Sequence, residues 1–279
     1  MAAGFFLFSA VDTQAKFLTQ TLHPIQIVWT RQLGLLIGVL FLLRLRGLAV
    51  LRTKTPLLQM SRGALAATSA TLFIVGVSFV PLADAVAISF VAPFFVTMLG
   101  ALILREPVGI RRWTAIIVGF GGTLIVIRPG LGVIHPGALL VMLAAFLFAL
   151  RQILSRMLSG GDRTETTVAY TALTGSALLT LPLPFFWHWP ETLLELGLLA
   201  GIALLAALGE FLIIRALEVG QAVVVAPMQY SMMIWGTFYG FVVFGDFPDF
   251  WTWVGAAVIV ASGIYTFYRE RQVMKNAET

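Results

Sequence analysis

The chain has 279 residues, of which 59% are hydrophobic and 11% are charged. Soluble domains carry about 25% charged residues, so this composition excludes an ordinary soluble protein and indicates one embedded in a membrane. The chain has no cysteine, which excludes disulfides, thiolate catalysis and cysteine-based metal sites. Its net charge of +5 does not indicate nucleic-acid binding, because the basic residues lie at the ends of apolar runs.

Three histidines, His23, His135 and His188, remain as candidates for metal binding or acid–base catalysis. They lie far apart, each beside a proline or a tryptophan at an expected loop, and none has the spacing of a metal site. We therefore expect no enzyme active site, no metal and no cofactor.

Ten apolar runs follow one another, each about as long as the 20 residues that a membrane-spanning helix needs. They cover residues 2–20, 25–45, 63–81, 85–104, 112–128, 137–157, 167–187, 196–217, 221–244 and 251–268. Their length and their Leu, Ala, Val and Phe content favour helices over buried strands, and the alternation of a transmembrane barrel is missing. The sequence predicts an all-α integral membrane protein with ten transmembrane helices. The first run has no basic segment or cleavage site, so we expect no signal peptide.

Charged residues at the breaks between the runs predict the orientation. Every second break is basic, and so is the C-terminal tail. The basic residues are Arg44, Arg46, Arg52, Lys54 and Arg62 at the second break, Arg105, Arg111 and Arg112 at the fourth, Arg156 and Arg163 at the sixth, Arg215 at the eighth, and Arg269, Arg271 and Lys275 in the tail. The other breaks carry Asp84, Glu191, Glu195, Asp246 and Asp249. Because cytoplasmic loops collect Lys and Arg, both termini are predicted to be cytoplasmic.

The two halves of the chain correspond when the sequence is shifted by 140 residues. Aligned pairs include Lys16 with Arg156, Gly100 with Gly240, and Trp113 with Trp253. We therefore expect two domains, 1–132 and 133–279, each with five spans. Because five is odd, the second domain crosses the membrane in the opposite orientation, which is the inverted repeat of secondary transporters. Such halves alternate between outward-open and inward-open arrangements, and the substrate site lies between them near the membrane midplane.

Particular residues strengthen this interpretation: Lys16, Pro24 and Arg31 in the first two runs, and Pro93, Glu106, Gly119 and Gly122 within residues 77–127. With them the chain resembles the drug/metabolite transporter superfamily, in its ten-helix EamA-type branch, over nearly its whole length. The resemblance implies a multi-pass protein of the bacterial inner membrane that exports amino acids or related small metabolites. The aromatic-rich second half is most similar to the amino-acid exporters and would suit aromatic or hydrophobic amino acids. That half departs from the pattern, since Asp246 replaces the glutamate and Thr171 the arginine.

Five charged residues lie within the spans and away from the span ends, where a charge costs roughly 2.5–3.5 kcal/mol and usually faces the interior or a wet cavity. Asp12 is a candidate cavity residue, and it can also pair with Lys16, which shares its helix face. Arg31 either holds a carboxylate or pairs with Asp12. Arg151 and Glu210 lie about two turns from the cytoplasmic ends of their spans, where a gate or a structural ion pair is expected.

Polar and aromatic residues complete the candidate cavity. Ser89, Pro93 and Thr97 form a stripe on the fourth span, and the Pro93 kink either frees a carbonyl for the cavity or is merely tolerated. The other candidates are Trp29, Gln152, Tyr170, Gln229, Tyr230, Trp235 and Tyr239. The aromatic rings among them either contact the substrate or serve packing and an interfacial belt.

The fifth and tenth spans are poor in polar groups and rich in small residues, namely Ala115, Gly119 and Thr123, and Ala257 and Ala261. Small faces allow close helix contact, so we expect these spans outside the cavity and at a homodimer interface.

Other functions remain open on the sequence alone. A transporter or exchanger of another metabolite or drug is the closest alternative, and a membrane scaffold without transport is a further one. An ion channel is disfavoured because no filter motif is found. The direction of transport and the coupling ion do not follow from these residues.

Overall fold

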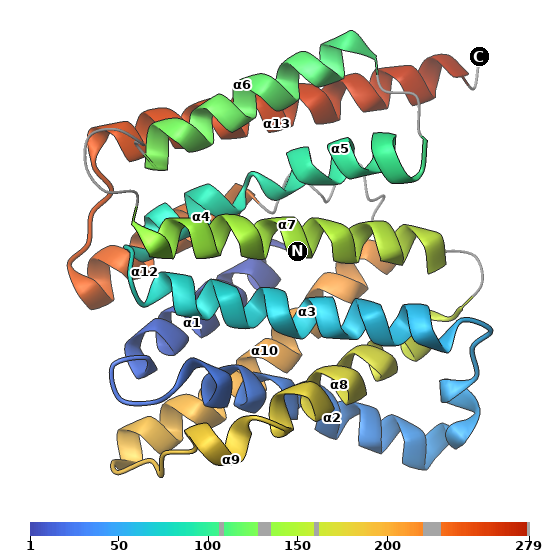
Figure 1. Ribbon diagram of the computed structural model, residues 1–279, viewed down its shortest axis with the longest axis vertical. Coiled ribbons are helices and arrows are strands. Elements are labelled where there is room, and N and C mark those ends of the chain that lie inside the picture. The colour runs from blue at the N-terminus through green and yellow to red at the C-terminus, as the bar shows by residue number, and fades with distance from the viewer. Residues whose placement is uncertain (106–108, 128–134, 159–161, 220–229, 278–279) are drawn as a thin grey trace.

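The structure of the chain is a computed structural model that describes residues 1–105, 109–127, 135–158, 162–219 and 230–277 (Figure 1). Over these ranges the regular elements are helices, and no strand occurs. They are α1 (Ala2–Leu18), α2 (Pro24–Arg46), the 3-10 helix η1 (Leu48–Leu51), α3 (Pro56–Val77), α4 (Leu82–Ser89), α5 (Ala92–Ile103), α6 (Ile110–Ile127), α7 (Pro136–Leu158), α8 (Thr164–Thr180), α9 (Leu183–Phe186), α10 (Leu193–Val219), α12 (Ser231–Phe244) and α13 (Phe250–Ala277). Each predicted apolar run overlaps one of these helices or two consecutive ones.

Prolines and glycines set several helix ends. Pro24, Pro56 and Pro136 are the first residues of α2, α3 and α7, where the missing N–H of proline leaves no hydrogen bond unmade. Gly245 ends α12 in a left-handed conformation with a φ of 73°, which glycine adopts without strain. The resulting turn folds the Asp246 backbone back against the end of α12.

The apolar run at 85–104 is divided into two helices. α4 ends at Ser89 and α5 begins at Ala92, with Pro93 in the first turn of α5. Because proline cannot donate a hydrogen bond to the carbonyl four residues earlier, the helix breaks here and the Ser89 carbonyl loses its helical partner.

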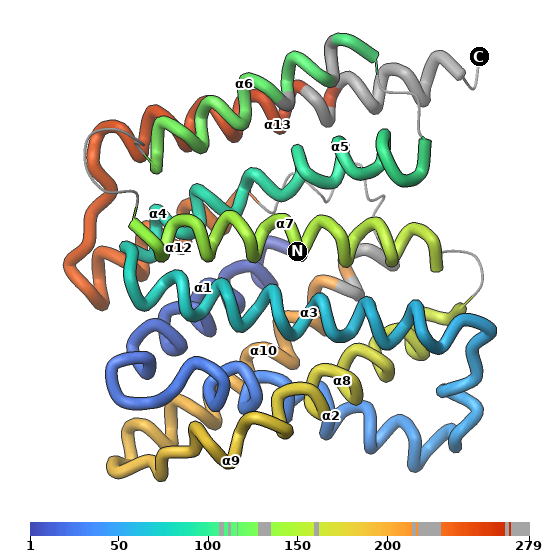
Figure 2. Tube along the Cα trace, viewed as in Figure 1, coloured from blue at the N-terminus to red at the C-terminus, as the bar shows by residue number. Residues whose placement is uncertain are grey.

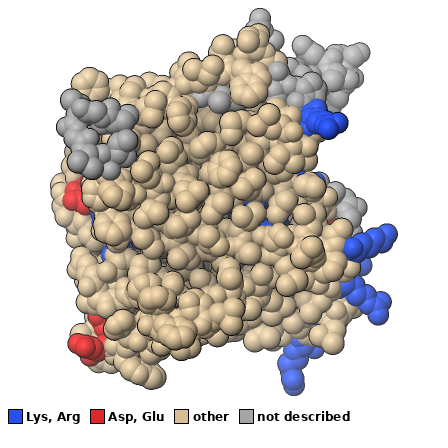
Figure 3. All heavy atoms as spheres, viewed as in Figure 1, with Lys and Arg blue, Asp and Glu red and all other residues tan. Residues whose placement is uncertain are grey.

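Among the residues that the structure describes, five helical segments are long and apolar enough to cross a membrane: Pro24–Arg46, Pro56–Val77, Leu82–Ile103, Pro136–Leu158 and Leu193–Ile213. Large apolar side chains in the middle of helices are exposed, among them Phe41, Ile117, Leu204 and Phe211. In Figure 3 most of the visible Lys and Arg surface lies at one end of the molecule and the visible Asp and Glu lie at the other, and the flank between them shows only small charged patches. This distribution is typical of a protein whose flanks contact lipid. We name the end where α2 finishes at Arg46 the basic end, and the end where α12 finishes before Asp246 the acidic end.

The helices pack as a bundle in which partners far apart in sequence lie side by side. α3 packs along α7, α1 along α10, and α2 against both α8 and α10. α6 and α13 lie together at one side of the bundle (Figures 1 and 2). The main apolar core draws buried residues from α1, α2, α3, α4, α7 and α10.

The pairing of α6 with α13 brings two glycines together. A Cβ atom built on Gly122 would lie 2.9 Å from the Gly255 carbonyl oxygen, and one built on Gly255 would lie 2.6 Å from the Gly122 carbonyl oxygen. The space beside Gly119, where a side chain would lie, is occupied by the Phe94 ring of α5. These small residues are therefore used within one chain, and the homodimer expected through these helices is not supported.

Candidate functional site

An ion pair lies inside the bundle between α1 and α2. Asp12 Oδ1 is 3.8 Å from Arg31 Nη1, and the Asp12 side chain is buried. The Arg31 guanidinium also lies over the Phe8 ring, 5.3 Å from its centroid. Asp12 therefore pairs with the arginine of the next helix rather than with Lys16 on its own helix.

A second arginine, Arg62 of α3, connects three helices from the inside. Its Nε donates to Ser155 Oγ of α7 at 2.6 Å, and its Nη1 donates to Thr171 Oγ1 of α8 at 2.5 Å. Both acceptors are neutral hydroxyls, so the positive charge of Arg62 has no carboxylate within ion-pair distance among the described residues.

Arg151 and Glu210, on α7 and α10, complete a group of charges inside the bundle. Arg151 lies within electrostatic range of Glu210 and Arg31, and Arg62 lies within range of Arg151 and Glu210. We name this group the interior charge cluster, and its members are Asp12, Arg31, Arg62, Arg151 and Glu210. It holds three guanidinium groups and two carboxylates, so it carries an excess positive charge.

Arg151 is the least satisfied member of the cluster. Its Nε is buried without a hydrogen-bond partner, and its guanidinium lies 4.7 Å from the Phe148 ring centroid one turn earlier on α7. The pairs within 4.0 Å in the described part of the chain do not include Arg151 or Glu210.

Aromatic rings of α1 and α12 meet in what we name the aromatic corner, made of Phe6, Trp235 and Tyr239. The Phe6 ring lies edge-on to Trp235 at 5.0 Å and tilted against Tyr239 at 5.6 Å between centroids. The Trp235 Nε1 and the Ser9 Oγ are both buried without a hydrogen-bond partner among the described groups. The corner therefore combines aromatic rings with a buried indole N–H that has no hydrogen-bond partner among the described residues.

The hydroxyl stripe at the α4–α5 break bonds to its own backbone. Ser89 Oγ donates to the Val86 carbonyl at 2.7 Å, and Thr97 Oγ1 donates to the Pro93 carbonyl at 3.1 Å. Such bonds to a preceding turn are the common use of helical Ser and Thr. Pro93 itself is half-buried in the first turn of α5.

Several candidates predicted from the sequence are not members of the interior charge cluster. Tyr170 Oη donates to the Leu51 carbonyl at 3.3 Å, and Trp29 Nε1 donates to Thr180 Oγ1 at 2.8 Å. Tyr230 packs against Phe90 with 5.3 Å between ring centroids. Gln152 is half-buried on α7. Gln229 lies outside the described residues.

Lys16 forms a separate contact at the acidic end. Its Nζ donates to the Val80 carbonyl of the α3–α4 turn at 3.1 Å and to Asp246 Oδ2 of the α12–α13 turn at 3.2 Å. It also lies 4.7 Å from the Phe244 ring centroid. We name this contact the Lys16 latch, because one ammonium group joins α1 to two turns that are distant in sequence.

Sequence reasoning missed Arg62, Phe6 and Ser9 as interior residues. Arg62 stands just before an apolar run and was assigned to a cytoplasmic break, but α3 begins at Pro56 and Arg62 therefore lies in its second turn. The N-terminal proline was the available signal. Phe6 and Ser9 are ordinary residues of an apolar run, and nothing in their spacing marked them.

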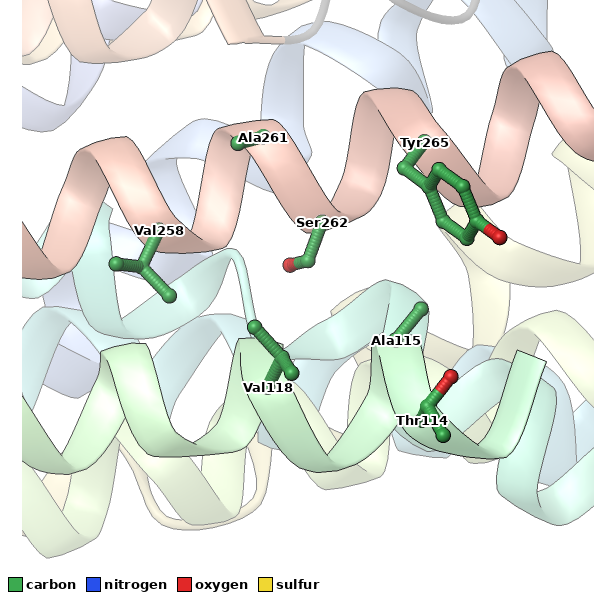
Figure 4. A pocket seen from close by; sticks show the side chains of 7 residues that line it. All are labelled: Thr114, Ala115, Val118, Val258, Ala261, Ser262 and Tyr265. Atoms are coloured by element: carbon green, nitrogen blue, oxygen red, sulfur yellow. The ribbon is translucent and has the colours of Figure 1, made fainter. Parts of the chain in front are cut away.

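One groove opens on the outer flank between α6 and α13 and has a volume of about 340 Å³ (Figure 4). Figure 4 shows Val118 and Ala115 of α6 facing Val258 and Ser262 of α13 across it. The groove is mostly apolar and contains no member of the interior charge cluster, so it is not the candidate site. Within the residues that the structure describes, no group of three His, Asp or Glu side chains is arranged to hold a metal ion.

Comparisons with known proteins agree with this architecture. The model of the EamA-like transporter family matches residues 1–128 and 135–268. An S-adenosylmethionine uptake transporter of Rickettsia bellii is 29% identical over 97% of this chain and 94% of its own length. A riboflavin transporter of Rhizobium johnstonii is 31% identical over 94% and 88% of the two chains. A pseudopaline exporter of Pseudomonas aeruginosa is 29% identical over 93% and 91%.

A solved crystal structure shares the fold, with a TM-score of 0.61 and 18% identity over 97% of this chain and 98% of that chain. The family match extends over both halves of the sequence, and the named relatives are transporters rather than enzymes. Together with the apolar helices and their exposed apolar flanks, these matches identify the chain as a multi-pass integral membrane transporter that belongs to the EamA-like transporter family.

Proposed function

We propose that this protein is a secondary transporter that exports amino acids or related small metabolites across the bacterial inner membrane by alternating access. Residues 1–132 and 133–279 form two repeats of opposite orientation, and the ten predicted spans cross the membrane with both termini on the cytoplasmic side. The basic end is then the cytoplasmic end, in agreement with the preference of Lys and Arg for that side.

The proposal rests on the way helix contacts repeat when the halves are exchanged. The 140-residue shift pairs α1 with α7, α2 with α8, α3 with α10, and α6 with α13. In the structure α3 packs on α7 and α8, while its counterpart α10 packs on α1 and α2 (Figure 1). Likewise α5 packs on α7, and α12 packs on α1. Matching contacts of this kind support two halves related by a pseudo-two-fold axis, which is the arrangement that alternates between open states.

The interior charge cluster supports a polar substrate. Charges inside a membrane protein are costly and usually mark a substrate or ion pathway. The cluster draws members from α1, α2 and α3 of the first half and from α7 and α10 of the second half. Its excess positive charge suits a metabolite with a carboxylate, and an amino acid is the smallest metabolite that also offers an ammonium group for Asp12 or Glu210. The aromatic corner suits an aromatic or hydrophobic side chain.

Flux measurements test the proposal. Purified protein is reconstituted into liposomes, and counterflow of labelled amino acids is measured alongside S-adenosylmethionine and riboflavin. We expect at least one amino acid, with aromatic ones first, to exchange faster than in protein-free liposomes. Exchange of amino acids at the protein-free rate would contradict the amino-acid assignment.

Transport of another metabolite is the second candidate, because the named relatives carry S-adenosylmethionine, riboflavin and pseudopaline. These relatives include both uptake transporters and an exporter. Counterflow of one of these compounds in place of amino acids would select this candidate, and a preset gradient in the same liposomes would reveal the direction.

A further inference from the structure

We infer that Arg151 binds the anionic group of the substrate, and that this group is a carboxylate. The inference deepens the proposed function, on which it rests, by naming the residue and the chemical group that meet in the site. It follows from how the three interior arginines differ in their partners.

Two of the three arginines already have partners. Arg31 has the Asp12 carboxylate at 3.8 Å and the Phe8 ring below it. Arg62 donates two hydrogen bonds to Ser155 and Thr171. Both side chains are therefore held in place by α1, α7 and α8.

Arg151 has an aromatic neighbour but no acceptor. Its guanidinium rests near the Phe148 ring at 4.7 Å, and its Nε is enclosed without an acceptor. Among the described residues its guanidinium makes no ion pair within 4.0 Å, although Glu210 is within electrostatic range. A partly buried guanidinium without a carboxylate is destabilising, so the fold retains an open donor where a ligand can supply the acceptor.

Charge and shape both favour a carboxylate as that acceptor. The cluster has one positive charge in excess, which a monoanionic group neutralises. A guanidinium keeps its charge at any working pH and presents parallel N–H donors that match the two oxygens of a carboxylate. Glu210 lies within electrostatic range of Arg151 but forms no ion pair with it within 4.0 Å among the described residues, so its carboxylate can attract the ammonium group of an amino acid.

Matched acids and amides test the inference on the purified full-length protein. The change in melting temperature is measured with a panel of amino acids and simple monocarboxylates, each compared with its own amide, and with inorganic phosphate. We expect the acids to raise the melting temperature, and the amides and phosphate to have little effect. Equal shifts from an acid and its amide, or a shift from phosphate alone, would overturn the carboxylate assignment.

Variants then assign the effect to Arg151. In Arg151→Met we expect the Kd for the best acid to rise at least about tenfold, because one charge-assisted hydrogen bond is lost. We expect the melting temperature without ligand to stay equal or to rise, since a partly buried charge without an ion-pair partner has been removed. Arg151→Lys should bind with intermediate affinity, because it keeps the charge without the planar fork. The matched control is Arg46→Met, an exposed arginine paired with Glu165 at the basic end, which should bind as the wild type does.

A lower melting temperature of Arg151→Met with unchanged affinity would show a structural residue and overturn the inference. Failure of every carboxylate to stabilise the wild type would overturn it as well. If monocarboxylates bind through Arg151 but amino acids do not, the inference stands and the amino-acid part of the proposed function fails. The two proposals are therefore separable in one experiment.

Discussion

Asp12 and Arg31 show how a pair of charges is kept inside an apolar bundle. The carboxylate is buried, the guanidinium is partly open, and the Phe8 ring shields one side of the pair. At 3.8 Å the pair is long for a hydrogen bond, so it depends mainly on charge attraction in a medium of low dielectric constant. Each partner therefore offsets the desolvation cost of burying the other, and the pair adds little net stabilisation to the fold.

Replacing one partner should be more harmful than replacing both. Asp12→Asn leaves Arg31 without a counter-charge and should lower the free energy of unfolding by about 1–3 kcal/mol. The double variant Asp12→Asn with Arg31→Gln should recover part of that loss. Thermal unfolding of the two single variants and the double variant in detergent measures the coupling. Additive losses in the double variant would show that the two groups do not interact.

At the scale of helices, the close contact between two helices depends on single glycines, which have no side chain. α6 and α13 contact each other where Gly122 faces Gly255, and the contacting atoms include the backbone carbonyl oxygens of both glycines, which cannot rotate away. In lipid, such backbone contact is a main source of helix association, because apolar side chains gain little by leaving acyl chains.

Gly122→Ala should therefore force α6 and α13 apart and destabilise the protein by about 1–3 kcal/mol. Gly121→Ala is the matched control on the same helix, since a Cβ there meets no atom within 4 Å. The melting temperatures of the two variants in detergent measure the difference. Equal melting temperatures would show that the helix contact is not as tight as the structure has it.

The start of α2 depends on a histidine at the membrane edge. His23 Nδ1 accepts a hydrogen bond from the Ile25 N–H at 3.3 Å, and the ring stacks on Phe186 at 4.2 Å between centroids. Partial burial, and then the nearby His188, lower the pKa of His23 below its ordinary value of 6.5. The neutral ring is the form that can accept this bond.

Acid should therefore weaken this cap. The pKa of His23 is lower in the folded protein than in the unfolded chain, so the unfolded chain takes up the proton first as the pH falls. The stabilisation by the neutral His23 cap is therefore present above pH 6.5 and is lost as the pH falls through the lowered pKa. Asparagine can cap the helix but does not titrate. Between pH 7.5 and pH 5 we therefore expect the melting temperature of His23→Asn to fall less than that of the wild type. The same loss in both proteins would exclude His23 as the cause.

At the scale of the whole molecule, the Lys16 latch joins turns from both halves at the acidic end. Lys16 is only 14% exposed, and it contacts the α3–α4 turn and the α12–α13 turn at the same time. If that end faces outward, as we propose, the latch holds the outer side closed. Opening then requires the ammonium group to leave both acceptors.

Lys16→Met should shift the equilibrium towards an open acidic end by about tenfold or more, because a charged hydrogen bond is lost. The chain has no cysteine, so labels at Phe79→Cys and Phe247→Cys report only the two turns. Double electron–electron resonance should detect a population with a longer distance between the two labels in Lys16→Met. The control Arg46→Met, with the same labels, should give the same distance distribution as the labelled protein that retains Lys16. Identical distance distributions for all three proteins would refute the latch.

Composition and the order of apolar and charged residues were sufficient for much of this account. They predicted a helical membrane protein, because the membrane imposes length and hydrophobicity on each span independently of its neighbours. The internal repeat and the resemblance to the EamA-type branch predicted a small-molecule transporter. The structure and the family match confirm both predictions. The ten-span count, the inverted repeat and the substrate remain predictions.

Partners across the bundle were decided by the tertiary structure alone. Asp12 had Lys16 one turn away, yet it pairs with Arg31, and Lys16 reaches Asp246, which is 230 residues further along the chain. Tyr170 and Trp29 are polar aromatic residues like Trp235, but their side chains bond at the periphery. Spacing along a helix determines which residues share a face. Packing determines which neighbouring helix that face contacts, and the ion-pair partner of a charge inside the membrane lies on that neighbouring helix.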